Sequence, residues 1–460
     1  MLSRRIFFVA LGIVLMALPG AQASAQPSSQ STWPPATLNA SIATDRVLVR
    51  LADGSPALPG AAPLFGQWYT APVVPGTPPQ QALAQTRARS SVVAAEQDYV
   101  IQISDAAVRT SSPAQPGAIS GALASYQWHL RVTQAPAVWP LTTGAGVVVA
   151  VIDTGIATNA PDLGCHSFTS PYNAITGAEG LAAAQDDNGH GTHVAGTVAQ
   201  CENNGMASGV TLMPIKACDE SGSCLMSNVA KGIAWASSHG AAVINLSLGA
   251  DCTGVGTGQW PDCSSDVVND AIAMATAADV VIVAAAGNFG ESTIDFPSNH
   301  PNVIAVGALD VLQQRTRYTN TGRGINLTAP GGDLFADVDG DGYADGVAQQ
   351  TLGALCGMPS EFAWCLLQGT SMAAPHVSGA AALLRAAAPT ATRGEIQAAL
   401  ESGATDLGVA GYDEIYGYGA LQVQAALHIL RPDIDMTTPP EQPTSGLHTT
   451  HSIYLPLLAR

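Results

Sequence analysis

The stretch Val147-Val148-Val149-Ala150-Val151-Ile152 indicates the fold class of this chain of 460 residues. It consists of β-branched and small apolar residues with no polar alternation, which is typical of a strand buried on both faces of a parallel sheet. Segments with helical spacing separate it from three similar runs. These runs are Ala242–Leu246, Asp279–Ala284 and Asn302–Val306. Strands that alternate with helices predict βαβ units, and therefore an α/β domain with a mostly parallel central sheet.

Helices are expected in five segments of the same region. They are His190–Ala199, Ser227–Ser238, Asp266–Ala277, Ser371–Ala387 and Arg393–Glu401. In open α/β sheets, functional sites form beyond the carboxyl ends of the strands. Asp153, Ser247 and Asn288 each come after a predicted strand, so we expect these side chains near one site.

A serine in the stretch Gln368–Val377 has the setting of a nucleophile. Ser371 follows Gly369-Thr370 and begins a run of small residues with helical character. A serine hydroxyl reacts only if a base takes its proton and nearby donors stabilise the oxyanion. The backbone N–H groups at a helix start can supply part of that stabilisation.

The base and its orienting partner are found upstream. His190 lies between two glycines, which leave room for a substrate, and Asp153 ends the first strand. His190 can accept the serine proton and return it to the leaving amine. Asp153 can fix the imidazole tautomer and stabilise the imidazolium. A second histidine, His193, shares the helix face, but no glutamate stands beside either as in a zinc-protease helix, so a metal role is disfavoured.

The segments around Asp153, His190 and Ser371, in that order, resemble the signatures of the subtilisin-like serine proteases, or subtilases. The resemblance runs from about Tyr126 to Leu430. It implies a subtilisin-like three-layer domain, a catalytic triad of these three residues and an acyl-enzyme intermediate. It also implies that Asn288 donates a hydrogen bond in the oxyanion hole.

The same resemblance implies the walls of a peptide-binding cleft. One wall would pair with the substrate backbone and the other would line the pocket for the residue before the scissile bond, called P1. The expected residues are Ser247, Leu248 and Gly249 for the first wall, and Ala285, Ala286 and Gly287 for the second. Extended peptide would then bind as an added strand.

Asp295 lies in Ser292–Pro297, at the position that lines the base of this pocket in subtilases. A carboxylate there would favour substrates with Lys or Arg at P1. The alternative is that Asp295 is paired internally or faces solvent, and the sequence leaves both open.

The segment Asp337–Asp345 predicts a structural calcium site. Its residue types match an EF-hand-type loop, with carboxylates at alternating positions and a glycine at the turn. The expected ligands are Asp337, Asp339, Asp341, Tyr343 and Asp345. Ala348 stands where such a loop carries a bidentate glutamate, so the site needs an outside ligand or binds more weakly. A solvated acidic turn is the alternative.

Composition changes divide the chain into four parts. Residues 1–25 combine Arg4 and Arg5 with the apolar run Ile6–Leu18, which is too short to span a bilayer and reads as a secretory signal. Residues 26–118, rich in Pro, Ala, Gln and Ser, form a small α+β domain in a position that resembles an inhibitory propeptide, with strands expected at Arg46–Leu51 and Tyr99–Ile103. Residues 119–430 form the catalytic domain and residues 431–460 a tail. Cleavage is expected between Ser111 and Ser125.

The net charge of −18, from 35 acidic and 17 basic residues, disfavours nucleic acid as a partner. We expect a secreted monomeric serine endopeptidase that acts on proteins or peptides, is inhibited by its own propeptide and has no stable membrane insertion. A catalytically silent, calcium-dependent binding protein on the same fold is the alternative.

The eight cysteines of an exported chain favour local disulfides. The expected pairs are Cys165–Cys201, Cys218–Cys224, Cys252–Cys263 and Cys356–Cys365.

Overall fold

The computed structural model describes residues 41–103, 127–252, 263–338, 340 and 342–434. Contacts divide the chain into residues 1–38 and 39–460, and all described residues belong to the second unit. The predicted signal peptide, the predicted cleavage region and almost all of the predicted tail therefore lie outside the described residues.

A mostly parallel sheet of eight strands forms the centre of residues 127–434, as the sequence predicts. Its order is β14-β13-β12-β10-β5-β8-β6-β7, and every neighbouring pair is parallel except β6 and β7. The strands are β5 (Val148–Asp153), β6 (Tyr172–Asn173), β7 (Ala178–Glu179), β8 (Thr211–Lys216), β10 (Val243–Leu246), β12 (Val281–Ala285), β13 (Ile304–Leu309) and β14 (Ile325–Pro330).

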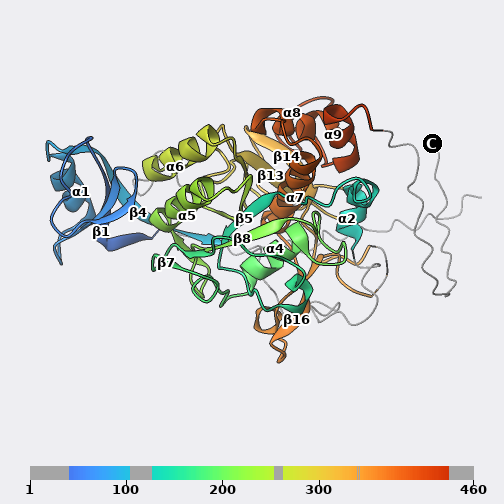
Figure 1. Ribbon diagram of the computed structural model, residues 1–460, viewed down its shortest axis with the longest axis horizontal. Helices are drawn as coiled ribbons and strands as arrows, with labels where there is room; N and C mark the ends of the chain where they lie inside the picture. The colour runs from blue at the N-terminus through green and yellow to red at the C-terminus, as the bar shows by residue number, and fades with distance from the viewer. Residues whose placement is uncertain (1–40, 104–126, 253–262, 339, 341, 435–460) are drawn as a thin grey trace, which may run out of the picture. The chain divides into compact units, whose positions relative to one another are not determined.

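Helices cover both faces of this sheet (Figure 1), which gives the predicted three layers. One layer contains α5 (Met226–Ser238) and α6 (Asp266–Ala277). The other contains α4 (His190–Ala199), α7 (Thr370–Ala387), α8 (Arg393–Gly403), α9 (Val423–Leu430) and the short helices α2 (Trp128–Val132) and α3 (Ala135–Val138). Two short 3-10 helices, Pro161–Leu163 and Gly353–Cys356, lie in connections.

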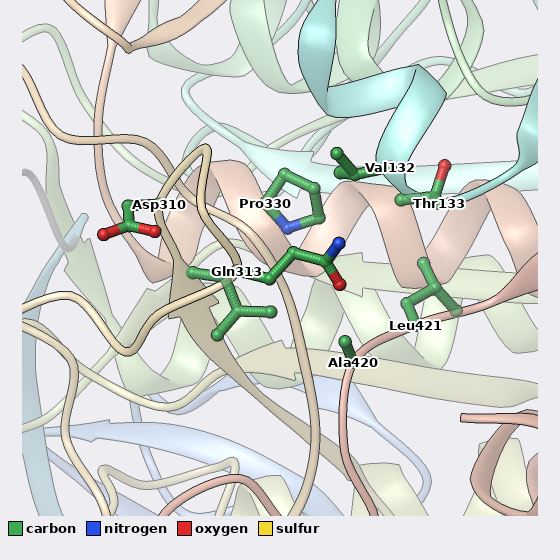
Figure 2. Close-up of a pocket in the computed structure, with 8 residues that line it drawn as sticks. Val132, Thr133, Asp310, Gln313, Pro330, Ala420 and Leu421 are labelled. Carbon is green, nitrogen blue, oxygen red and sulfur yellow. The ribbon is translucent and has the colours of Figure 1, made fainter. Parts of the chain in front are cut away.

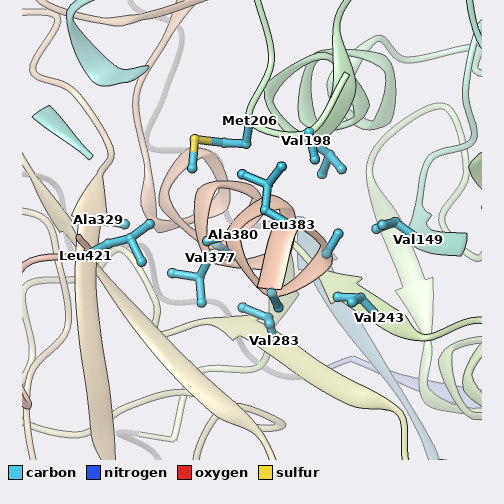
Figure 3. Packing of buried hydrophobic residues seen from close by; sticks show 14 of the residues in the cluster. Val149, Val198, Met206, Val243, Val283, Ala329, Val377, Ala380, Leu383 and Leu421 are labelled. Carbon is cyan, nitrogen blue, oxygen red and sulfur yellow. The ribbon is translucent and has the colours of Figure 1, made fainter. Parts of the chain in front are cut away.

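The alternation of side chains along β5 joins the layers. Val149 and Val151 face the cluster around α4 and α7, whereas Ala150 and Ile152 face the cluster around α5 and α6. Figure 3 shows α7 between valines of the sheet and Val198 of α4. Because both faces are buried, the strand has no polar positions, which is the pattern that the sequence displays.

The predicted elements agree with the structure to within one or two residues at most ends, but strands β6, β7, β8 and β14 and helix α9 were not predicted. Strand β8 was not predicted because it contains Pro214, and proline is rare in a central strand since it cannot donate to the ladder. In addition, Asn288 does not follow its strand directly: β12 ends at Ala285, and two residues lie between Ala285 and Asn288.

Residues 41–103 form the expected small α+β domain. Its antiparallel strands β1 (Ile42–Leu51), β2 (Ala62–Phe65), β3 (Trp68–Pro72) and β4 (Val92–Ile103) lie in the order β2-β3-β1-β4, with helix α1 (Pro79–Arg87) packed on β1 and β4. The end of β4 continues beyond this sheet. It pairs with β9 (Ser223–Leu225) and with β11 (Leu248–Gly249), both antiparallel.

All four predicted disulfides are present. The Cys356–Cys365 bond joins the connection after β15 (Val347–Leu352) to β16 (Phe362–Leu367), and these two strands form a separate hairpin. Among the described residues, no helix is both long and apolar enough to cross a membrane.

Candidate functional site

Asp153 and His190 form a buried pair. Asp153 is the last residue of β5 and His190 is the first residue of α4. The Nδ1 atom of His190 donates to Oδ1 of Asp153 at 2.8 Å, and both side chains are inaccessible to solvent. Because Nδ1 carries the proton, Nε2 is the atom that can act as a base.

Ser371 lies at the start of α7, in the same region. Helix α4 packs along α7. Strand β10 lies beside β5, with Asn245 opposite Val151, so Ser247 follows β10 at about the level of Asp153. The Ser371 hydroxyl donates to the carbonyl of Ser247 at 3.3 Å, and the Ser247 hydroxyl donates to the Ser371 carbonyl at 2.7 Å. Ser371 is thus held between α7 and the segment that follows β10.

Asn288 is oriented by Thr370, the residue before the serine. Its Oδ1 atom accepts hydrogen bonds from the Thr370 amide at 2.8 Å and from the Thr370 hydroxyl at 2.9 Å. The same hydroxyl accepts from the Gly287 amide at 3.1 Å. With Oδ1 occupied by these donors, the carboxamide can turn only its Nδ2 donor toward a reacting group.

Two strands flank the end of β4 at this site. Leu248 and Gly249 of β11 stand opposite Ile103 and Gln102, and Ser223 of β9 also stands opposite Gln102. The Gly222 carbonyl accepts from the Ile103 amide at 2.9 Å. The sequence predicted the β11 wall but missed the β9 wall. A Ser-Gly-Ser turn before a three-residue strand is too weak a pattern to find it.

Asp295 is buried between the two predicted walls. Its Oδ1 atom accepts from Nδ2 of Asn320 at 2.9 Å, and Oδ2 has no hydrogen-bond partner among the described residues. A Cβ placed on Gly249 or Gly287 would lie 3.1 or 2.6 Å from that Oδ2 atom. Burial, with a smaller contribution from Asp251, raises the pKa of Asp295 well above its ordinary value. Among the alternatives to a pocket role for Asp295, solvent exposure is wrong, because the side chain is fully buried, whereas internal pairing is present at Oδ1 through Asn320.

The acidic loop is described in part, since Asp339 and Asp341 lie outside the described residues. The Asp337 carboxylate accepts from the amides of Gly340 at 2.9 Å and Gly342 at 3.2 Å. The buried Asp345 accepts from the Val338 amide at 2.8 Å. The two carboxylates thus lie at the ends of one tight turn, and Tyr343 belongs to that turn. Oxygen donors in a tight turn are chemically suited to calcium.

A small pocket elsewhere does not involve these residues. It lies where the segment after β13 meets α2 and the segment before α9, and Asp310, Gln313 and Leu421 are among its lining side chains (Figure 2). None of the predicted catalytic or substrate-binding residues lines it.

The chain is similar in sequence to known proteins. The sequence model of the Subtilase family matches residues 144–419. Subtilisin Savinase of Lederbergia lenta is 36% identical over 307 residues, which are 66% of this chain and 98% of the relative. Subtilisin DY of Bacillus licheniformis is 37% identical over 294 residues, covering 62% of this chain and 91% of the relative. An alkaline protease of Alkalihalobacillus alcalophilus is 36% identical over 66% of this chain and 70% of its own.

Proposed function

The chain belongs to the subtilase family and is a serine-type endopeptidase, and we propose that Asp153, His190 and Ser371 are its catalytic triad. The observation that carries this proposal is the buried 2.8 Å hydrogen bond from His190 to Asp153, together with the bonds of Ser371 to Ser247, which follows the strand next to β5. A catalytically silent binding protein would have no need of an aspartate buried against that histidine.

In the proposed reaction, Nε2 of His190 takes the proton from Ser371 as Oγ attacks the carbonyl carbon of the peptide bond. Asp153 stabilises the imidazolium that forms. The C–N bond then breaks, and His190 gives its proton to the leaving amine. Water, activated by the same histidine, hydrolyses the resulting ester and restores the serine.

Asn288 is proposed to stabilise the oxyanion, together with the backbone N–H groups at the start of α7. The two hydrogen bonds from Thr370 fix its carboxamide before substrate binds, so no reorganisation is needed during the reaction. Replacing Asn288→Ala should lower kcat by about 100- to 1000-fold, the loss typical of one oxyanion-hole donor. An Asn288→Ala enzyme with a normal kcat would exclude this role.

Substrate is proposed to bind as an extended strand against Ser247, Leu248 and Gly249, with Ala285, Ala286 and Gly287 on the pocket side. The pairing of β11 with β4 supports this mode, because a piece of this same chain already adopts it. The β9 strand adds a second wall, so that a peptide in the place of β4 would be paired on both edges.

The domain of residues 41–103 is proposed to be an inhibitory propeptide, within the predicted range 26–118. The end of β4 occupies the place proposed for substrate. Two carboxylates of β4 also cap helices of the catalytic domain. Asp98 accepts from the amide and hydroxyl of Ser227 at the start of α5. Glu96 accepts from the Ser265 hydroxyl and from the first two amides of α6.

Asp295 is proposed to select Lys or Arg at P1. Its unpartnered Oδ2 atom is buried between Gly249 and Gly287, where neither wall has a side chain to cover it. A cationic side chain entering the pocket would lower the pKa of Asp295 toward its ordinary value and give the carboxylate a partner. The test compares kcat/KM on peptides with Arg, Phe and Leu at P1. Asp295→Asn should lower kcat/KM for the Arg peptide alone. Equal reduction of all three would exclude the selection.

The loop Asp337–Asp345 is proposed to hold a structural calcium ion through its carboxylates, with Asp339 and Asp341 among them. When bound, calcium would neutralise the acidic turn and cross-link its two ends.

Secretion is also a proposal, based on residues 1–25, and an N-terminal sequence of exported protein that begins at Met1 would exclude cleavage of a signal.

The triad is tested by labelling the purified protein with a fluorophosphonate, which forms a covalent bond only with an activated serine. We expect labelling of the wild type and none of Ser371→Ala or His190→Ala. Ser378→Ala on the same helix is a matched control and should be labelled normally. Label retained in Ser371→Ala would assign the nucleophile elsewhere.

A further inference from the structure

One disulfide lies in a hairpin that joins the proposed catalytic aspartate to the proposed substrate wall. Cys218 and Cys224 close the turn between β8 and α5, and both are fully buried. Cys224 is the central residue of β9, opposite Ile101 of β4. The disulfide therefore ends directly in a strand that pairs with a peptide chain.

The other end of the hairpin is attached to the backbone of Asp153. The amides of Ala217 and Cys218 both donate to the Asp153 carbonyl, at 2.8 and 3.1 Å. The Nζ atom of Lys216 donates to the carbonyls of Thr154 at 2.8 Å and Cys218 at 3.1 Å. Cys218 is thus fixed to the end of β5, and the disulfide holds Cys224 at a fixed distance from Cys218.

The turn itself is short and ordered by one carboxylate. Asp219 accepts from the amide and hydroxyl of Ser221 and from the amide of Ser223, at 2.7 to 3.1 Å. Gly222 has a φ of +79°, and its carbonyl accepts from the Ile103 amide. The hairpin meets the paired strand through this carbonyl and through the Ser223 hydroxyl, which accepts from Gln102 Nε2 at 2.9 Å.

We propose that the Cys218–Cys224 disulfide is a positioning element for extended substrates: it holds β9 at the distance from Asp153 at which residues before P1 can pair with it. This inference rests on the proposed function. Without the bond, the position of β9 depends on the turn, on the backbone bridge between Cys218 and Cys224 and on the start of α5. Part of the binding free energy of each paired residue is then spent on ordering β9. The effect should therefore grow with the number of residues on the acyl side of the substrate.

The test uses a series of p-nitroanilide substrates with the same P1 residue and one to four residues on the acyl side. In the double variant Cys218→Ser/Cys224→Ser, the ratio of kcat/KM between the longest and shortest substrates should fall about tenfold, mainly through KM. Cys165→Ser/Cys201→Ser, which removes a disulfide away from β9, is the matched control and should keep the wild-type ratio. Equal losses at every length would overturn the proposal, since they would indicate a general loss of structure.

A second variant guards against misfolding of the first. Asp219→Ala loosens the same turn but keeps the disulfide, and should lower the ratio in the same direction by a smaller factor. A fall in Asp219→Ala as large as the tenfold fall expected for the double variant would overturn the proposal, because the intact disulfide would then not be enough to hold β9. Fluorophosphonate labelling measures the active fraction of each variant. A wild type that is not labelled would instead overturn the proposed function, and this inference with it.

Discussion

The N-terminal and catalytic domains differ in how their cores are completed. The catalytic domain has a sheet buried on both faces and carries all four disulfides. The domain of residues 41–103 has no cysteine and only one small cluster of its own, around Val47, Val49 and Leu83. The opposite face of its sheet, including Leu48 and Trp68, belongs to the cluster around α5 and α6. The catalytic domain therefore buries its core by itself, whereas one face of the N-terminal sheet is buried only against α5 and α6 of the catalytic domain.

The largest effect should come from separating the two. A chain of residues 41–103 alone would expose the borrowed face and lose the hydrogen bonds of Glu96 and Asp98, and a domain of this size has little stability to spare. We expect it to be unfolded by circular dichroism and to fold when the catalytic domain with Ser371→Ala is added. A cooperative thermal transition of the isolated domain would contradict this comparison.

The next effect concerns the two helix caps. Replacing Asp98→Ala leaves the amide and hydroxyl of Ser227 buried without their acceptor, which costs roughly 1–3 kcal/mol. Inhibition of the mature enzyme by the N-terminal domain, added in trans, should weaken by roughly 10- to 100-fold. Asp45→Ala, an exposed carboxylate of the same domain, is the control and should change the inhibition constant little.

The stability of the two domains should also differ in how it depends on acid pH. Four buried histidines, His129, His190, His193 and His376, lie in the catalytic domain, and residues 41–103 contain none. Burial lowers the pKa of His193 to about 3 and that of His376 to about 4, and it lowers that of His129 well below its ordinary value. His129 Nδ1 donates to His376 Nε2 at 2.8 Å, because Nδ1 of His376 already donates to the Met372 carbonyl.

The sign follows from the depressed pKa values. Below about pH 6.5 the unfolded chain binds protons that the folded domain refuses, so stability falls as the pH falls toward 4, by roughly 1.4 kcal/mol per pH unit for each histidine. Urea unfolding of the mature domain between pH 7 and 5 measures the slope. His129→Gln should lower this slope by the contribution of one histidine. An unchanged slope would show that His129 does not contribute.

The smallest effect is expected from the acidic loop. If calcium binds at Asp337–Asp345, EDTA should lower the Tm of the mature domain by a few degrees. Asp337→Asn should have the same effect without EDTA and should remove the response to it. A Tm that EDTA does not change would exclude a stabilising calcium ion.

The sequence predicted the strands and helices of the catalytic domain far better than it predicted the contacts of the N-terminal domain. Strand β5 and helix α4 have local patterns that predict them, and Asp153 and His190 meet because both lie at element ends. Strand β9 and the caps of Glu96 could not be found, because their partners are more than a hundred residues away. Asp295 remained undecided for the same reason: its environment is made by Gly249 and Gly287, whose closeness the sequence does not encode locally.

Strand β4 has a kinetic consequence. It is a single strand from Val92 to Ile103, so the half that builds the N-terminal sheet and the half that pairs with β9 and β11 move together. If residues 41–103 act as the proposed propeptide, cutting the chain after Ile103 removes a covalent link but leaves β4 paired with β9 and β11. Activity should appear with a lag after cleavage, and the length of that lag should follow the rate at which the whole domain dissociates or is digested.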